Sequence, residues 1–242
     1  MKIQQINDWW LIESKVTKST NDDALNFELP KNDNKKFAFS AERQTGGRGR
    51  LGRKWNDGEG NLMLSSIVTC SNEDVGRLAL ISGICVLQAI KFFAGTVDVK
   101  LKWPNDVLLN NKKVCGILLE RKDEKNMVVG IGVNIKNAPM LSNCTYQATS
   151  LKENDIFVEK YEFLRRFFEI FDEWLEKIEK REFNEIQNFW NANAKGINEQ
   201  IEIRNVKENI LGRLIGVDEN GALLLEKDGK ASSIVAGDIC YL

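Results

Sequence analysis

The sequence predicts an α+β domain followed by a small all-β barrel, and three observations support this fold class. Strand-like and helix-like stretches alternate over residues 1–196. Two helix-like stretches, at 73–94 and from 157 onward, place apolar side chains at intervals of three and four residues. After Gly196 the pattern changes to short alternating segments separated by turns, which is typical of a small barrel. We therefore expect two domains, residues 1–196 and 197–242.

The first part of the chain is expected to begin as a strand followed by a helix. Residues 8–16 are apolar and favour a strand, and Ser19 to Asp23 supply capping side chains and first-turn acids for a helix near 20–28. Three segments then follow: a strand at 36–43, a glycine- and arginine-rich loop at 44–60 and a strand at 61–70. So long a loop inside a compact domain is usually functional.

A core helix is expected from Glu73 to Ala94, ending near Gly95. Asn110-Asn111 predicts a turn within the strand-rich stretch that follows. The strands expected there are 99–102, 107–109, 113–120 and 127–135.

A second long helix is expected to begin near Phe157, and its apolar residues form two stripes. Packing against the main sheet explains two stripes, and a subunit contact is the alternative. A shorter helix, Glu182 to Ala194, precedes the barrel. Its strands are expected at 201–204, 210–217, 222–226 and 231–235.

Composition narrows the function classes. The chain has 34 basic and 35 acidic residues, so its net charge gives no general attraction to nucleic acid or to an anionic membrane. It has no histidine, which excludes Ser/His and Cys/His catalysis and every histidine-ligated metal site. Five cysteines without a CxxC spacing predict buried, reduced thiols; they are Cys70, Cys85, Cys115, Cys144 and Cys240.

The N-terminus shows no secretory signal. The longest apolar stretch, Leu78 to Ile90, is too short to cross a bilayer. We therefore expect a cytoplasmic protein.

The segment from Arg43 to Lys54, RQTGGRGRLGRK, predicts an anion-binding loop. It combines four glycines with five basic residues and no acid. Glycines let the backbone approach a ligand, and guanidinium groups bind phosphate or carboxylate in a bidentate manner. It matches neither the P-loop nor the GxGxxG pattern. A solvated basic loop is the alternative.

A second group of candidate residues is Lys102-Trp103-Pro104-Asn105-Asp106, followed by Lys112-Lys113 and Gly116. Pro104 favours an extended conformation at Trp103, so Asn105 and Asp106 are presented at an edge between strands. Lys113 begins an apolar strand and is expected to project from the end of the sheet toward a ligand. The alternative without a functional role is a solvated charge at a strand end.

Taken together and in order, these segments resemble biotin protein ligases over nearly the entire chain. The resemblance rests on Ser19-Thr20-Asn21, Glu42-Arg43-Gln44, Gly47 to Trp55 (GRGRLGRKW), Lys102 to Asp106 (KWPND), Lys113 with Gly116, and Gly130 to Ile135 (GIGVNI). It implies a class II synthetase-like catalytic domain of mixed sheet and helices, with a C-terminal SH3-like barrel.

The resemblance also implies a reaction. ATP and biotin, with Mg²⁺, would give biotinyl-5′-AMP, and the biotinyl group would pass to one lysine of a biotin carboxyl carrier domain. That domain would belong to acetyl-CoA carboxylase or a related carboxylase. A lipoate or octanoate ligase or transferase of the same fold is the alternative, and the GRGRxGRxW loop favours biotin.

Site residues carry over by matching position. Lys113, Arg48 and Arg50 are expected to be catalytic. The biotin-binding residues would be Ser19, Thr20, Asn21, Gln44, Arg48, Gly49, Arg50, Lys113 and Gly116. The nucleotide-binding residues would be Arg48, Arg50, Arg53, Trp55, Asn105, Asp106, Lys113, Gly132 and Asn134. The metal ligands stay unknown.

Plainer explanations stay open for some of these residues. Ser19 and Thr20 suit helix capping, Trp55 suits hydrophobic anchoring, and Asn105 and Asp106 suit turn chemistry.

The expected partners are small molecules and one carrier protein. Met1 lies too close to Ser19 for the DNA-binding domain of some family members, so we expect no repressor role, no nucleic acid and no membrane. A monomer and a homodimer both remain open. A rival class is a nucleic-acid-binding module that uses the basic loop and the barrel, but the near-zero net charge argues against it.

Overall fold

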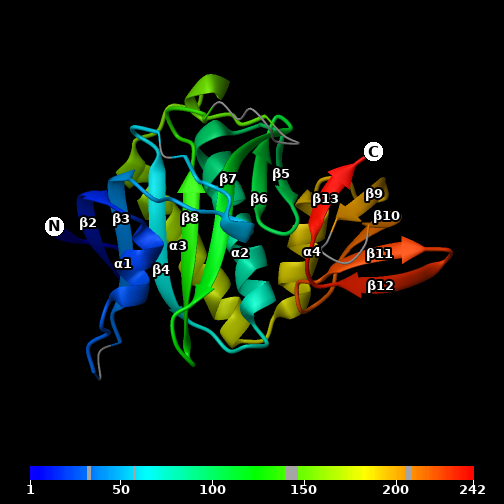
Figure 1. Cartoon of the computed structure of the whole chain (residues 1–242), viewed down its shortest axis with the longest axis horizontal. Coiled ribbons are helices and arrows are strands. Elements are labelled where there is room, and N and C mark those ends of the chain that lie inside the picture. Colours follow the sequence, from blue (N-terminus) through cyan, green and yellow to red (C-terminus); the bar gives the residue numbers. More distant parts are fainter. Residues whose placement is uncertain (32–33, 57, 140–146, 205–208) are drawn as a thin grey trace.

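The computed structural model describes residues 1–31, 34–56, 58–139, 147–204 and 209–242, and Figure 1 shows two sheets joined by helices. Over these residues the larger sheet has eight strands. In spatial order they are β1 (Lys2–Ile6), β2 (Trp9–Thr17), β3 (Lys36–Gln44), β4 (Leu62–Thr69), β8 (Asn126–Val133), β7 (Lys112–Arg121), β6 (Asp106–Leu109) and β5 (Val99–Lys102). Among the described strands of this sheet, only β2 and β3 pair in parallel, so the predicted mixed sheet is confirmed.

The helices divide between the two faces of this sheet (Figure 1). Helices α2 (Val75–Ala94) and α3 (Lys160–Glu179) lie behind it, and α4 (Phe183–Asn193) lies between it and the smaller sheet. The short helix α1 (Thr20–Asn26) lies in front, and the loop after β3 crosses the same face. The front face is thus covered by a loop and one short helix, which leaves room for a cleft.

Helix α2 forms the centre of the core. Its residues Leu78, Ile81, Ile84 and Leu87 are fully buried because they face both the sheet and α3. It runs for 20 residues, longer than the apolar stretch seen in the sequence, and is long and apolar enough to cross a membrane. Two thirds of that span, 67%, is buried within the protein, as expected for a core helix.

Helix α3 buries both of its apolar stripes inside the chain. Phe163 and Phe167 belong to one stripe and Phe168 and Phe171 to the other, and none of the four is exposed. Phe168 stacks on Trp9 of β2, with 4.8 Å between ring centroids, and α3 also packs along α2. Packing within the chain therefore accounts for the two stripes.

A second, antiparallel sheet follows Gly196, and its described residues form five strands. In spatial order these are β12 (Lys230–Ile234), β11 (Leu223–Lys227), β10 (Asn209–Val217), β9 (Gln200–Arg204) and β13 (Asp238–Tyr241). The predicted small all-β unit is confirmed, while closure into a barrel and the domain boundary stay predictions.

Two strands were missing from the sequence prediction. β1 is a polar edge strand in which only Ile6 is buried, so it lacks apolar alternation. β13 also lacks apolar alternation, because Ile239 and Cys240 are consecutive buried residues, yet it pairs with β9 and lies beside the cleft.

Candidate active site

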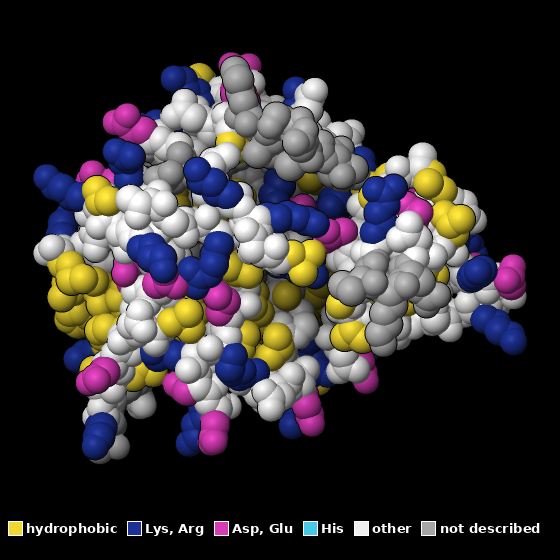
Figure 2. Space-filling view, in the orientation of Figure 1, with side chains coloured by type: hydrophobic (Ala, Val, Ile, Leu, Met, Phe, Trp, Pro, Cys, Tyr) yellow, Lys and Arg dark blue, Asp and Glu magenta, His cyan; other side chains and the backbone are white. Residues whose placement is uncertain are grey.

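A cleft of about 760 Å³ opens on the front face, between the main sheet, the loop after β3 and the C-terminal sheet. Figure 2 shows Lys and Arg side chains gathered over the middle of this face. All fifteen predicted site residues line this one cleft: Ser19, Thr20, Asn21, Gln44, Arg48, Gly49, Arg50, Arg53, Trp55, Asn105, Asp106, Lys113, Gly116, Gly132 and Asn134. The sequence pattern therefore grouped residues that the fold brings together.

Glycines make the floor of the cleft. In β8 the side chains of Val129, Ile131 and Val133 join the core around α2, so the alternation of the strand turns Gly130 and Gly132 toward the cleft. A Cβ on Gly130 would lie 2.2 Å from Asn21 Oδ1, and one on Gly132 would lie 2.3 Å from Trp55 Cζ2. The GIGV sequence is thus required by close contacts on its front face.

One end of the cleft is lined by neutral polar side chains. The backbone N–H of Thr20 donates to Gln44 Oε1 over 2.8 Å, and the Thr20 hydroxyl lies 3.1 Å from the same atom. Ser65 of β4 donates from Oγ to Asn21 Oδ1 over 2.5 Å, and the same Oγ lies 2.8 Å from Thr20 Oγ1. These residues offer neutral donors and acceptors in a buried setting, which suits an uncharged polar ligand.

The capping alternative for Ser19 is wrong. Ser19 is the N-cap residue of α1, but among the described residues its side chain makes no capping hydrogen bond. The Thr20 hydroxyl is directed to Gln44 instead. Ser65 was not predicted, because it lies inside a strand and no motif marks it.

Arg48 fastens the loop to the main domain. Its Nη2 lies 2.8 Å from Glu120 Oε2 on β7, and its Nη1 lies 2.7 Å from Asp22 Oδ1 on α1. Burial lowers the pKa of the Arg48 guanidinium, but Glu120 and Asp22 outweigh it and leave the pKa raised. A solvated basic loop does not describe this residue, since it is anchored by two carboxylates.

Lys113 and Asp106 form an ion pair at the centre of the floor. Lys113 Nζ lies 2.5 Å from Asp106 Oδ1, and the Lys113 side chain is 26% exposed. Lys102 Nζ lies 3.6 Å from Asp106 Oδ2, and burial lowers the pKa of Lys102 despite the nearby carboxylate. Lys113 is therefore a partly buried cation facing the cleft, and the solvated strand-end alternative is wrong.

Asn105 and Trp55 both line the cleft and also contact other parts of the main domain. Asn105 Nδ2 donates to the Ile117 carbonyl on β7 over 2.8 Å, while its Oδ1 lies 3.4 Å from Arg50 Nη1. The Trp55 ring lies against Gly116 and Gly132. Its indole therefore covers part of the floor in this structure.

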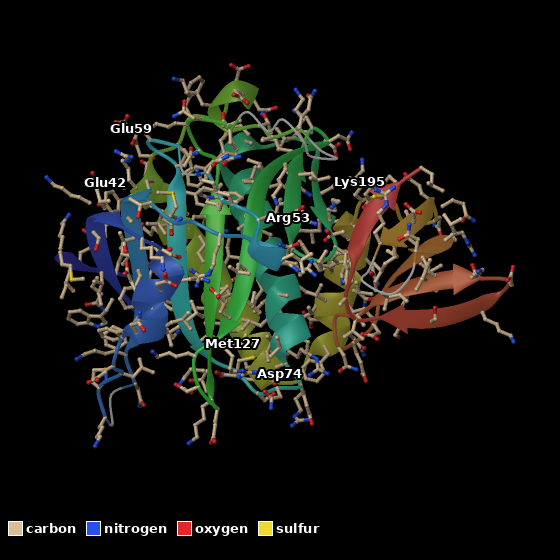
Figure 3. The ribbon with its side chains drawn as sticks, viewed as in Figure 1. Glu42, Arg53, Glu59, Asp74, Met127 and Lys195 are labelled. Atoms are coloured by element: carbon tan, nitrogen blue, oxygen red, sulfur yellow. The ribbon has the colours of Figure 1, made fainter. Side chains whose placement is uncertain are left out.

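The C-terminal sheet contributes Asp238 to the cleft. Arg53 Nη2 pairs with Asp238, and Arg50 Nη1 lies 3.7 Å from Asp238 Oδ1. Burial lowers the pKa of Arg50, and Asp238 and Asp106 offset part of this effect. Figure 3 shows Arg53 in front of the main sheet, on the side nearest the C-terminal sheet. Asp238 was not predicted, because it lies in the unrecognised strand β13.

Asn134 is held by the backbone at the edge of the cleft. Its Nδ2 donates to the Thr149 carbonyl over 3.0 Å, and its side chain is buried. In the described part of the chain no three His, Cys, Asp or Glu side chains form a group that could hold a metal ion. Asp106 and Asp238 are the carboxylates that line the cleft.

Comparisons with known proteins agree with this arrangement. Residues 13–135 match the Biotin/lipoate A/B protein ligase family, and residues 196–240 match the Biotin protein ligase C terminal domain. The biotin--[acetyl-CoA-carboxylase] ligase of Paracoccus denitrificans is 30% identical over 236 residues, which cover 93% of this chain and 98% of that protein.

Longer relatives and solved structures are also similar. The bifunctional ligase/repressor BirA of Bacillus subtilis is 30% identical over 209 residues, and the match spans 82% of this chain but only 64% of that protein. The structure of biotin protein ligase from Aquifex aeolicus in complex with biotin and ATP superposes with a TM-score of 0.83 at 29% identity, covering 95% of this chain and 97% of that one. The chain belongs to the biotin/lipoate A/B protein ligase family and carries the C-terminal domain of biotin protein ligases.

Proposed function

We propose that this chain is an ATP-dependent biotin protein ligase. The observation that carries the proposal is a single cleft with a neutral polar end at Ser19, Thr20 and Gln44, and a cationic end at Arg50 and Lys113. A neutral ring with N–H and C=O groups suits the first end, and carboxylate and phosphates suit the second. Relatives named as biotin ligases support this choice, and so does a similar structure that holds biotin and ATP.

The first half-reaction joins biotin to AMP. A carboxylate oxygen of biotin attacks the α-phosphorus of ATP, a new O–P bond forms, and the bond to the β-phosphate oxygen breaks with its electron pair leaving on pyrophosphate. Negative charge builds on the phosphoryl oxygens during this step. Lys113 and Arg50 would stabilise that charge as fixed cations in a partly buried site.

The second half-reaction transfers the biotinyl group. The neutral ε-amine of a carrier lysine attacks the carbonyl carbon of biotinyl-5′-AMP, an amide bond forms, and AMP leaves with the electron pair of the C–O bond. The amine loses a proton during the transfer. The anchored loop would keep the adenylate from water until the lysine arrives, and Arg48 would serve by holding that loop through Glu120 and Asp22.

Mg²⁺ would enter with ATP. It commonly keeps several waters and binds one or two carboxylates together with substrate phosphates. The donors present fit this mode, because Asp106 and the Asn105 amide lie beside Lys113 and Arg50 at the cationic end. Asp106 is the residue we would assign to the ion.

The wider setting is part of the same proposal. Residues 1–196 would form the catalytic domain and residues 197–242 the C-terminal domain, and the acceptor would be a biotin carboxyl carrier domain. The protein would act in the cytoplasm. The predicted biotin and nucleotide residues other than Arg48 keep their roles, and buried Ser65 supports Thr20 and Asn21 at the polar end.

Substrate-dependent AMP formation and protein labelling test the proposal. The purified chain, biotin, ATP, Mg²⁺ and a carrier domain should give carrier protein heavier by one biotinyl group, and omission of ATP or of biotin should abolish this product. Lipoate or octanoate should neither replace biotin nor compete with it at equal concentration. Attachment of lipoate in preference to biotin would overturn the assignment.

A further inference from the structure

The turn between β10 and β11 is fastened to the main domain by two side chains. Trp103 Nε1 donates to the Gly221 carbonyl over 3.1 Å, and only 2% of Trp103 is exposed. Arg77 of α2 donates from Nε to the Glu219 carbonyl over 2.7 Å and from Nη2 to Asn220 Oδ1 over 2.8 Å. Trp103 thus reaches away from the cleft, although its neighbours in the KWPND segment line it.

The backbone of this turn sits directly on the start of α2. A Cβ on Gly76 would lie 1.9 Å from the Asn220 carbonyl oxygen. Gly221 has φ +83°, and a Cβ there would lie 2.7 Å from the Gly76 carbonyl carbon. Since no side chain fits on either side, the turn packs backbone to backbone on the start of α2, where the hydrogen bonds of Trp103 and Arg77 hold it.

Hydrogen bonds within the turn make it rigid, so a change in its position is transmitted to the strands of the C-terminal sheet. Asp218 Oδ1 accepts from the N–H groups of Asn220 and Ala222, both at 2.9 Å, and the N–H of Gly221 donates to the Asp218 carbonyl over 3.0 Å. Continuous pairing then runs from β10 through β9 to β13. A shift of the turn would therefore displace β13 as well.

The far end of this path returns to the cleft. Asp238 on β13 pairs with Arg53 and lies 3.7 Å from Arg50, and Arg50 in turn lies 3.4 Å from Asn105. Asn105 is two residues beyond Trp103 in the chain. The contacts form a closed ring: Trp103, the turn, the C-terminal sheet, Asp238, Arg50 and Asn105.

We propose that Trp103 is a positioning residue that acts through the C-terminal sheet: its indole N–H fixes the β10–β11 turn so that Asp238 holds Arg50 and Arg53 in place for the nucleotide. The proposal rests on the proposed function, which makes the nucleotide ATP. The polar end of the cleft is built by α1, β3 and β4 through Thr20, Gln44 and Ser65. The influence of Trp103 is therefore selective for ATP over biotin.

The replacement Trp103→Phe removes the indole N–H and keeps a large aromatic ring. The KM for ATP in adenylation should rise about fivefold, the scale of one neutral hydrogen bond, while the KM for biotin stays within about twofold. Trp174→Phe is the matched control, because Trp174 is 6% exposed and donates to Gln88 Oε1 over 2.7 Å within the helical layer. It should lose comparable thermal stability and leave both KM values unchanged. Equal changes in both KM values for Trp103→Phe, or none, would overturn the proposal.

A double-mutant cycle with Asp238→Asn tests the route of the effect. If Trp103 acts through Asp238, the KM for ATP in the double variant should rise by clearly less than the product of the two single changes. A KM increase in the double variant equal to the product of the two single changes would mean that Trp103 acts independently of Asp238, and it would refute the inference.

A measurement without substrates separates this inference from the proposed function. In ligand-free Trp103→Phe the amides of Asp238 to Tyr241 should exchange hydrogen faster than in the wild type, and in Trp174→Phe they should not. Unchanged hydrogen exchange in β13 of Trp103→Phe would refute the positioning role of Trp103. If the variants show the expected exchange pattern but the wild type has no ligase activity, only the proposed ATP-dependent ligase function is refuted.

Discussion

Lys113 Nζ lies 2.5 Å from Asp106 Oδ1, and this contact joins β7 to β6 at the floor of the cleft. The Asp106 side chain is only 14% exposed and lies between two ammonium groups, those of Lys113 and Lys102. A carboxylate held in this way directs Lys113 toward the cleft. The contact therefore links the structure of the KWPND segment to the chemistry proposed for Lys113.

Asp106→Asn is predicted to weaken adenylation without unfolding the protein. The variant keeps the size of the side chain and removes the charge that orients Lys113, so the rate of adenylation should fall about 10-fold to 100-fold. Asp98→Asn is the control, since Asp98 is exposed near the start of β5. An Asp106→Asn enzyme with the wild-type rate would show that neither the orientation of Lys113 nor the proposed magnesium contact depends on this carboxylate.

Gly132→Ala is predicted to displace Trp55 and impair the enzyme. The added Cβ would lie 2.3 Å from the indole ring, closer than any van der Waals contact permits. Combining it with Trp55→Phe, which removes the contacted atoms, should restore part of the activity lost by Gly132→Ala alone. Steady-state kinetics of both single variants and the double variant check this, and failure of any rescue would place the damage elsewhere.

Glu120→Gln is predicted to loosen the arginine-rich loop. Glu120 holds Arg48 through two oxygens, and a neutral amide retains only a weaker contact. Trypsin cleavage between Arg48 and Lys54 in the native protein should become about fivefold faster. Glu124→Gln, in the exposed turn between β7 and β8, should leave the cleavage rate unchanged. Equal rates in the two variants would contradict the role given to Arg48.

The four described cysteines are free and buried, as predicted, and Cys144 lies outside the described residues. Burial raises the pKa of Cys70 to about 11 and also raises the pKa of Cys85 and Cys115. At pH 8 about one Cys70 thiol in a thousand is ionised, so alkylation should be slow and accelerate about tenfold per pH unit up to pH 11. Peptide mapping after iodoacetamide treatment checks this, and rapid labelling of Cys70 at pH 8 in the folded protein would contradict it.

Sequence reasoning succeeded where a pattern repeats or a motif is dense. The long helices α2 and α3 follow from apolar side chains at helical spacing, and the glycine- and arginine-rich loop and KWPND predict residues that line the cleft. The sequence did not reveal Ser65, which supports Thr20 and Asn21 from beneath the cleft, or Asp238, which lines it. Each takes its place only by strand pairing over long sequence separations, which no local pattern reports.

Two interpretations changed because side chains found unforeseen partners. Arg48 was expected to be available for anions, but Glu120 and Asp22 already hold it. Trp103 was considered only as part of a strand-to-strand transition, but it donates to Gly221 in the C-terminal sheet. A motif gives the residue types at a site, whereas the partner of each side chain depends on the tertiary fold.

Biotin-dependent exchange of labelled pyrophosphate into ATP tests the central claim most directly, because it reports the adenylation step without a carrier protein. The wild type should exchange only when biotin is present, and Lys113→Ala should lose about 100-fold to 1000-fold of the rate. Lys112→Ala, at the exposed neighbouring position of β7, should exchange like the wild type. No exchange by correctly folded wild type, with biotin and lipoate each supplied, would contradict the assignment of this cleft to biotin adenylation.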